Sequence, residues 1–229
     1  MKKNNDPGVT VCDVPTFAIV TVAKPVFTKT MKTSITLLTL ALLGITTITN
    51  AQERLSSGEA NRIAQLTRQN PNLLSNAPLY VEADLEQSVA LAKDDFGGLL
   101  IPIEGLSEGT ESDVGTEPVA IGELWLRNLT LEKNGWGISS SQLNVVTVNT
   151  EEGRVRAPRC ILAVSKTDDN KPVLMIYGKN EQPLLTLPLS KVQKNQTKPL
   201  DMSASDDGKV DLCINGQYQA SFSVAELYL

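Results

Sequence analysis

The sequence predicts a mainly β fold: an antiparallel β-sandwich or barrel of about eight strands, with a short N-terminal helical segment. After residue 98, short apolar runs follow one another and are separated by turn residues such as Gly, Asn and Asp. Helical periodicity is nearly absent from that region. The alternative is an α+β fold in which the early helices cover one face of a sheet. Neither fold defines a function.

Residues 31–51 have the pattern of a secretory signal peptide. Lys32 gives it a positive start, residues 35–48 form the apolar stretch, and cleavage is expected between Ala51 and Gln52. The apolar stretch has about fourteen residues, whereas a membrane-spanning helix needs about 20. We therefore expect a secreted or periplasmic protein with no stable membrane anchor.

The remaining chain is expected to form one domain. Residues 1–30 precede the signal, and we interpret them as a mis-annotated start or a leader extension. Residues 52–78 are predicted to be an N-terminal helical segment, and residues 79–229 a β-rich domain. The 178 residues after Ala51 are enough for one hydrophobic core and too few for two comfortable domains.

Composition excludes several classes of function. The net charge of the chain is −5, and it becomes −8 when residues 1–51, with five Lys and two Asp, are removed. Binding to phosphates needs clustered Lys and Arg, so nucleic acid is not an expected partner. The chain contains no histidine, which excludes Ser-His-Asp and Cys-His catalysis and His-ligated metals. We expect no cofactor and no metal.

Signal cleavage would remove Cys12 and leave two cysteines. Cys160 and Cys213 are then a candidate disulfide in an oxidising compartment, closing a loop of about 53 residues. Strand patterning argues against the bridge: Cys213 is predicted on the polar face of its strand, whereas Cys160 shares a face with Leu162 and Val164. The sequence leaves this disulfide open.

The first elements are predicted from caps and spacing. Residues 56–59, Ser-Ser-Gly-Glu, have the form of a capping box, so a helix is expected to begin there and to end before Asn70-Pro71. A strand is expected at 78–83. Asp84 is expected to cap a short second helix, since apolar and small residues follow at helical spacing. These residues are Leu85, Ser88, Val89 and Ala92.

The middle of the chain is predicted as strands joined by turns. Residues 99–103 form the second strand, and Pro102 places it at a sheet edge or a bulge. The acidic stretch 104–117 lacks the spacing of a calcium loop and is expected to be a solvated loop. Residues 119–131 are expected to be one long strand. Their apolar residues change from even-numbered to odd-numbered positions around Arg127-Asn128, which predicts a β-bulge there.

The later strands are bounded by clear turn signals. They are expected at 143–148, 159–165, 173–177 and 184–189, and Pro188 places the last of these at a sheet edge. A final hairpin is predicted from two alternating runs. Its apolar faces coincide only if Ile214 lies opposite Tyr218, which requires a three-residue loop, Asn215 to Gln217.

Two tryptophans and an amide suggest carbohydrate binding. Trp136 lies between two glycines in a predicted turn, where it would offer a stacking surface to a sugar ring; placement of this side chain in the core is the favoured interpretation. Trp125 is the other stacking candidate. Asn134 is the adjacent hydrogen-bonding candidate.

A carboxylate-based hydrolase is the other alternative. It would need two carboxyl groups about 5 to 9.5 Å apart in a cleft. Asp94, Asp95 and Glu123 are the candidates, although turn or surface positions explain each of them equally simply.

We expect an exported, non-catalytic β-domain with a structural, envelope or protein-interaction role. The expectation is drawn from missing motifs: the chain after Ala51 contains no G-x-S-x-G, S-x-x-K, C-x-x-C or phosphate-binding loop. Its partner is not identified by the sequence, and a glycan or an envelope protein is the candidate.

Overall fold

The computed structural model describes residues 53–69, 78–109, 114–150, 153–205 and 209–227. Within these residues the fold is mainly β, as predicted, with fourteen strands rather than about eight and one α-helix. The proposed leader, the signal peptide with its cleavage site Ala51-Gln52, and the helix stop at Asn70-Pro71 lie outside the described residues. In the described ranges, no helix has the length and apolarity needed to span a membrane.

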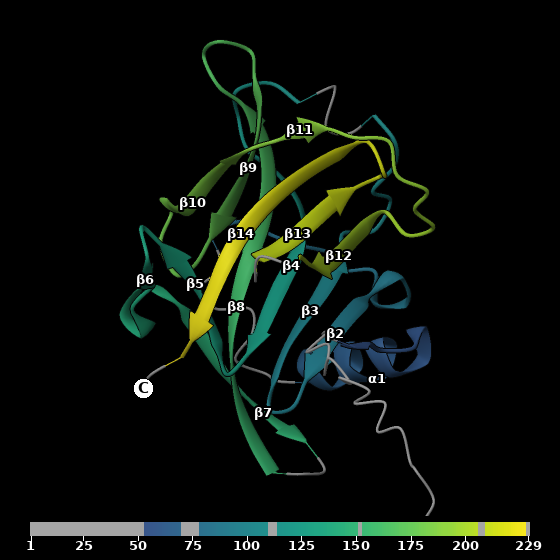
Figure 1. Cartoon of the computed structure of the whole chain (residues 1–229), viewed down its shortest axis with the longest axis vertical. Helices are drawn as coiled ribbons and strands as arrows, with labels where there is room; N and C mark the ends of the chain where they lie inside the picture. Colours follow the sequence, from purple (N-terminus) through teal and green to yellow (C-terminus); the bar gives the residue numbers. More distant parts are fainter. Residues whose placement is uncertain (1–52, 70–77, 110–113, 151–152, 206–208, 228–229) are drawn as a thin grey trace, which may run out of the picture. The chain divides into compact units, whose positions relative to one another are not determined.

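The larger of two antiparallel sheets has eight strands. They are β1 (Glu53–Arg54), β2 (Val89–Lys93), β3 (Phe96–Pro102), β4 (Val119–Arg127), β7 (Asn144–Thr150), β8 (Gly153–Lys166), β9 (Pro172–Tyr177) and β10 (Pro183–Pro188). Their order is β1-β2-β3-β4-β8-β9-β10, and β7 pairs with β8 (Figure 1). Because β1 and β10 lie at opposite ends of this order, the sheet is open.

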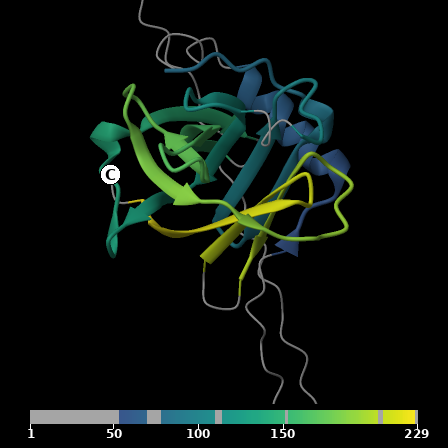
Figure 2. The same ribbon diagram turned by 90° about the horizontal axis from the view of Figure 1, so that it is seen from above.

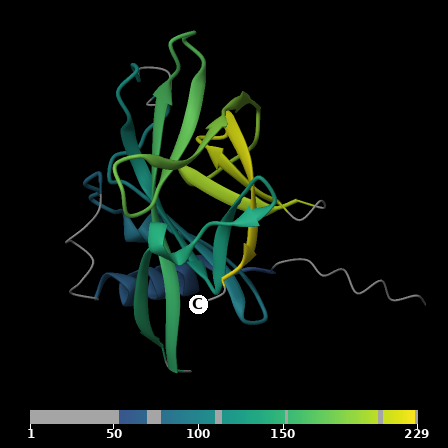
Figure 3. The ribbon, with the colours of Figure 1, turned by 90° about the vertical axis from the view of Figure 1, so that its left-hand side faces the viewer.

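The smaller sheet has six strands and lies against one face of the larger one (Figure 3). They are β5 (Leu129–Lys133), β6 (Trp136–Gly137), β11 (Ser190–Lys191), β12 (Leu200–Ala204), β13 (Lys209–Ile214) and β14 (Tyr218–Glu226). Their order is β12-β13-β14-β5-β6, with β11 paired to β14. Two open sheets therefore form a sandwich.

The main core lies between the two sheets. Alternate residues of each strand point into it, among them Leu124 of β4, Leu162 of β8 and Leu212 of β13. The opposite, outer face of the larger sheet is covered too. Helix α1 (Ser57–Arg68) packs on β2, β3, β4 and β7, and Leu79, Val81 and Ala83 pack on β8 and β9 (Figure 2). Residues 157–165 of β8 are consequently buried on both faces.

The predictions for residues 78–93 need correction. Residues 78–83 contain no strand and contribute only the isolated bridge between Ala83 and Ile103. Asp84 does act as a cap, but of a 3-10 turn, η2 (Leu85–Gln87), and not of a helix. Residues 89–93 form β2, because Val89 and Leu91 face the main core while Ala90 faces α1. Because both faces of β2 are covered, its buried residues do not show the simple alternation of a half-exposed strand. Their spacing in the sequence therefore resembled that of a helix.

Strand β3 is not an edge strand, since it lies between β2 and β4. Pro102 is its last residue, so the missing backbone donor falls where the pairing ends. The prediction does hold for Pro188, which ends the edge strand β10.

Residues 119–131 are not one bulged strand but two strands in different sheets. Asn128 separates β4 from β5 and has a φ of 55°, in the left-handed region. Its side chain donates to the Asp95 carbonyl at 2.9 Å, and its own carbonyl accepts from the Leu227 amide at 2.9 Å. The change of parity in the sequence therefore marks a corner at which the chain leaves the larger sheet for the smaller one.

The final hairpin has the predicted register. Ile214 pairs with Tyr218, and the Gln217 amide donates to the Ile214 carbonyl at 2.9 Å across the loop Asn215 to Gln217. Asn215 and Gly216 have φ values of 48° and 69°, which these two residue types tolerate better than others.

Candidate functional site

Helix α1 begins at the predicted capping box. The Glu59 amide donates to Ser56 Oγ at 3.3 Å, and the Ser56 amide donates to Glu59 Oε2 at 3.0 Å. The helix buries small residues, Ala60, Ala64 and Thr67, against the sheet. Short side chains on this face let the helix backbone approach the strands closely.

A buried ionic cluster attaches the C-terminal end of α1 to the sheet. Glu123 of β4 is fully buried, and its Oε1 accepts from Arg68 Nη2 at 2.8 Å and from Arg159 Nη2 at 2.6 Å. Its Oε2 accepts from Trp125 Nε1 at 2.9 Å. Both carboxylate oxygens are thus hydrogen-bonded, which is what a charge needs to remain in an apolar interior. The cluster holds α1 to β4 and β8.

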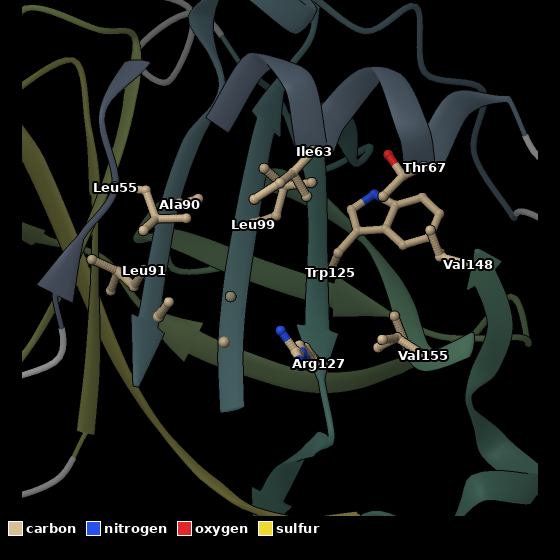
Figure 4. A pocket seen from close by; sticks show the side chains of 14 residues that line it. Leu55, Ile63, Thr67, Ala90, Leu91, Leu99, Trp125, Arg127, Val148 and Val155 are labelled. Atoms are coloured by element: carbon tan, nitrogen blue, oxygen red, sulfur yellow. The ribbon is translucent and has the colours of Figure 1, made fainter. Parts of the chain in front are cut away.

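Beside this cluster, between α1 and the outer face of the larger sheet, lies a half-open cavity of about 140 Å³ (Figure 4). Ile63 and Thr67 of α1 border one side of it, with Leu55 before the helix. The rest of the wall comes from strands β2, β3, β4, β7 and β8. It includes Ala90, Leu99, Trp125, Val148, Val155 and Ala157.

The room for this cavity comes from small residues on neighbouring strands. Ala90 and Ala92 of β2 and Gly97 of β3 line it, and Ala92 pairs with Gly97. A methyl group added at Gly97 would approach the Leu91 carbonyl oxygen to 3.0 Å, so this position has little room for a side chain. Alanine and glycine side chains at these positions occupy less of the space under α1 than the larger Leu99 and Trp125 do.

Among the lining residues that the structure describes, three have side chains with polar atoms. The Thr67 hydroxyl donates to the Ala64 carbonyl at 2.7 Å, and the Trp125 indole donates to Glu123, so both are engaged within the fold. The third is Arg127, whose side chain is 37% exposed and whose Nη2 lies 3.6 Å from Asp95 Oδ1. Arg127 thus brings a positive charge to the boundary between the apolar wall and solvent.

The carbohydrate-binding candidates are separated by the fold. Trp125 is buried in the sheet, so it offers no stacking surface at the protein exterior. Trp136, expected in the core, is instead 80% exposed on β6, because that short strand ends the smaller sheet. Asn134 lies in the turn before it, with a φ of 56°. Trp136 and Asn134 remain neighbours at one sheet end.

The hydrolase candidates do not meet. Asp94, with a φ of 52°, and Asp95 form the β2–β3 turn. Glu123 is not a surface residue, as it lies in the buried cluster. Asp95 lies beside Arg127, four residues along β4 from Glu123, and four residues of a strand span about 13 Å. That exceeds the carboxyl separations used in glycoside hydrolysis.

Both described cysteines are free thiols, so the disulfide left open by the sequence is absent from this structure. Cys160 points into the main core, whereas Cys213 alternates with the core residues Leu212 and Ile214 of β13 and faces the other way. Burial raises the pKa of the Cys160 thiol to about 12, against a smaller opposing effect of the Arg159 charge. Burial also raises the pKa of Cys213.

Sequence reasoning missed Arg68, Arg127 and Arg159. The available signal was a charged residue inside an apolar strand: Glu123 and Arg127 both occur in β4, and Arg159 begins the apolar run of β8. Such residues are rarely buried unless they are paired. In the described part of the chain, no group of three His, Cys, Asp or Glu side chains is placed to hold a metal ion.

Comparisons with known proteins give no relative from which to transfer a function. No protein-family model matches the chain. No curated protein and no solved structure gives a significant match.

Proposed function

We propose that this protein is an exported, non-catalytic β-domain that acts by binding, and that the cavity beside α1 is its ligand site. Export is inferred from the signal-peptide pattern of residues 31–51. One observation supports the site: a half-open cavity whose described wall is almost entirely aliphatic or aromatic, with Arg127 as the single charged side chain among the described residues that line it. Ligand sites of proteins typically combine an apolar lining with a few polar groups.

The volume limits what the cavity accepts. An engineered protein cavity of roughly 150 Å³ holds a benzene molecule, and this one measures about 140 Å³. We therefore assign it an apolar group of about six carbons. Because the cavity is half-open, the remainder of a longer ligand or of a partner protein would extend into solvent. This is compatible with the envelope or protein-interaction role expected from the sequence.

Tryptophan fluorescence tests the site directly. The chain has two tryptophans, so the variant Trp136→Phe keeps Trp125, in the cavity wall, as its only indole. Titration of this variant with hexanol should change the emission of Trp125 saturably. Adding Ala92→Leu, which fills the half-buried rim, should abolish the change. Ala225→Leu, a half-buried alanine on β14 in the smaller sheet, is the matched control and should preserve it. An emission unchanged by hexanol would refute the proposal.

Carbohydrate binding at Trp136 is the second candidate. It is supported by the 80% exposure of this side chain, beside Asn134. Exposed aromatic side chains have an apolar face that a sugar ring can cover. Affinity electrophoresis through gels containing soluble polysaccharides should retard the unmodified chain and not Trp136→Ala. If no polysaccharide retards the unmodified chain, this candidate is removed.

A further inference from the structure

We propose that the Asn134-Gly135 turn between β5 and β6 is a site of spontaneous deamidation, which converts Asn134 to aspartate and isoaspartate in the folded protein. The observation that carries the proposal is a contrast between the two Asn-Gly pairs of the chain, Asn134-Gly135 and Asn215-Gly216. Both asparagines have left-handed φ values, of 56° and 48°. The tertiary structure leaves the first pair exposed and holds the second in place by hydrogen bonds.

The reaction needs only the chain and water. The backbone nitrogen of Gly135 attacks Cγ of the Asn134 side chain, loses its proton and expels the side-chain nitrogen as ammonia, which closes a succinimide ring. Water then opens the ring at either carbonyl group. The product is aspartate, or isoaspartate where the main chain continues through the former side chain. Glycine favours the attack because it has no side chain to obstruct the approach.

The Asn134-Gly135 turn is open to solvent. Both residues are exposed, and they form the two-residue loop between Lys133 and its pairing partner Trp136. A methyl group added at Gly135 would meet no heavy atom within 4 Å beyond its chain neighbours. Within the described ranges, neither the Asn134 side chain nor the Gly135 amide hydrogen-bonds to another residue. The two reacting groups are therefore not held by the described part of the fold.

The Asn215-Gly216 pair is held at both reacting groups. The Asn215 side chain donates to the Ser107 carbonyl oxygen at 2.9 Å, and the Gly216 amide donates to Gln196 Oε1 at 3.0 Å. Gly216 is buried, and a methyl group added to it would collide with the Lys194 carbonyl oxygen. Both hydrogen bonds must break before this pair can react, so its deamidation is expected to be slow.

The two turns also differ in how easily they open. In the left-handed conformation the following amide nitrogen points away from the asparagine side chain, so the turn must open before the attack. Strand β6 has two residues and lies at the end of the smaller sheet, paired with β5 (Figure 1). Opening at Asn215 would instead separate β13 from β14, which pair over six positions. Segments with few contacts open at a lower free energy, which again favours reaction at Asn134.

Deamidation would change the surface beside Trp136. A neutral amide becomes a carboxylate next to the exposed indole ring, and isoaspartate adds one carbon to the main chain of the turn. The two-residue loop sets the register of this hairpin, so the longer backbone is expected to disrupt the pairing of Lys133 with Trp136. Asn134 is also the hydrogen-bonding candidate for carbohydrate, so that candidate site would change as the protein ages.

The test follows both sites in the same protein. The whole chain is incubated in mildly alkaline buffer made with heavy-oxygen water, and peptide mass mapping measures the label gained at Asn134 and at Asn215. We expect Asn134 to convert at least about tenfold faster, because two additional hydrogen bonds to break raise the barrier at Asn215 by about that factor. The labelled Asn134 peptide should separate chromatographically into aspartate and isoaspartate forms.

Two comparisons assign the difference to the fold. In urea the two Asn-Gly pairs lose their tertiary contacts, so their rates should become similar. In folded Gln196→Ala, which removes the acceptor of the Gly216 amide, Asn215 should convert faster while Asn134 keeps its rate. Gln193→Ala, at an exposed position of the same loop, is the matched control and should change neither rate.

Two results would overturn the proposal. One is an equal rate at the two sites in the folded chain. The other is conversion of Asn134 in urea but not in the folded chain, which would mean that the turn protects it. Both are decided by the unmodified sequence, so a Gln196→Ala variant that fails to fold does not block the decision.

Discussion

Arg159 Nη2 donates to Glu123 Oε1 at 2.6 Å in the buried outer layer of the larger sheet, where both side chains are almost completely removed from solvent. The two residues belong to adjacent strands, β8 and β4. Arg68 of α1 binds the same carboxylate oxygen at 2.8 Å. The pair is thus the attachment point of the helix that borders the cavity.

Removing the charge of Glu123 should be strongly destabilising. Glu123→Gln leaves Arg159 buried without its counter-ion, and breaking a buried ion pair costs about 3 to 5 kcal/mol. Urea unfolding followed by circular dichroism measures this loss. Glu117→Gln, at an exposed position, should change the free energy of unfolding by less than about 0.5 kcal/mol. Equal effects of the two substitutions would contradict the structural role of Glu123.

The capping box of α1 should contribute measurable stability. Ser56→Ala removes the acceptor of the Glu59 amide and should lower the free energy of unfolding by about 1 kcal/mol. Ser57→Ala, one residue later and already inside the helix, should be close to neutral. Urea unfolding of the two variants in parallel distinguishes the cap from a general effect of serine removal.

The same cap predicts a pH dependence. Hydrogen bonds from Ser56 lower the pKa of Glu59 below its usual value of 4.5. The folded state therefore favours the carboxylate, so this stabilisation is complete above pH 4.5 and is lost as the pH falls through the lowered pKa. An NMR titration of the Glu59 carboxyl should give a lower midpoint in the unmodified chain than in Ser56→Ala. Identical midpoints would remove Ser56 as the cause.

The corner at Asn128 should tolerate glycine better than alanine. Asn128 has a φ of 55°. In this left-handed conformation, a residue other than Gly, Asn or Asp lowers the stability of the fold by about 1 to 2 kcal/mol. Both substitutions remove the side-chain hydrogen bond to the Asp95 carbonyl, so this loss cancels in the comparison. Asn128→Ala should be about 1 kcal/mol less stable than Asn128→Gly in thermal unfolding. The reverse order would mean that the left-handed conformation is not required there.

The two buried thiols should be protected from alkylation in the folded chain. With a pKa of about 12, Cys160 is almost entirely protonated near neutral pH, and the thiolate is the reactive form. Iodoacetamide followed by peptide mass mapping should label Cys160 and Cys213 slowly in native buffer, and both rapidly in urea without reductant. Labelling in urea only after reduction would demonstrate a disulfide and overturn their assignment as free thiols.

Neighbouring residues encoded the parts of the fold that the sequence predicted well. Ser56 and Glu59 are three positions apart, so their capping box is readable without tertiary information. The pairing of Ile214 with Tyr218 follows from two alternating patterns across a short loop. Pro188 excludes its strand from the sheet interior because it has no backbone donor. The mainly β class follows from many such short-range signals.

Tertiary structure decided which faces are covered, and that determined the candidate site. The sequence could not show that β5 leaves the sheet of β4 at Asn128, because a change of parity is common to bulges and corners. It could not show that Glu123 is buried and Trp136 exposed, since both depend on whether another layer lies over the strand. The cavity with Arg127 at its mouth exists only where α1 covers residues from five strands. Such a site depends on contacts between distant segments, which the spacing of residues along the chain does not record.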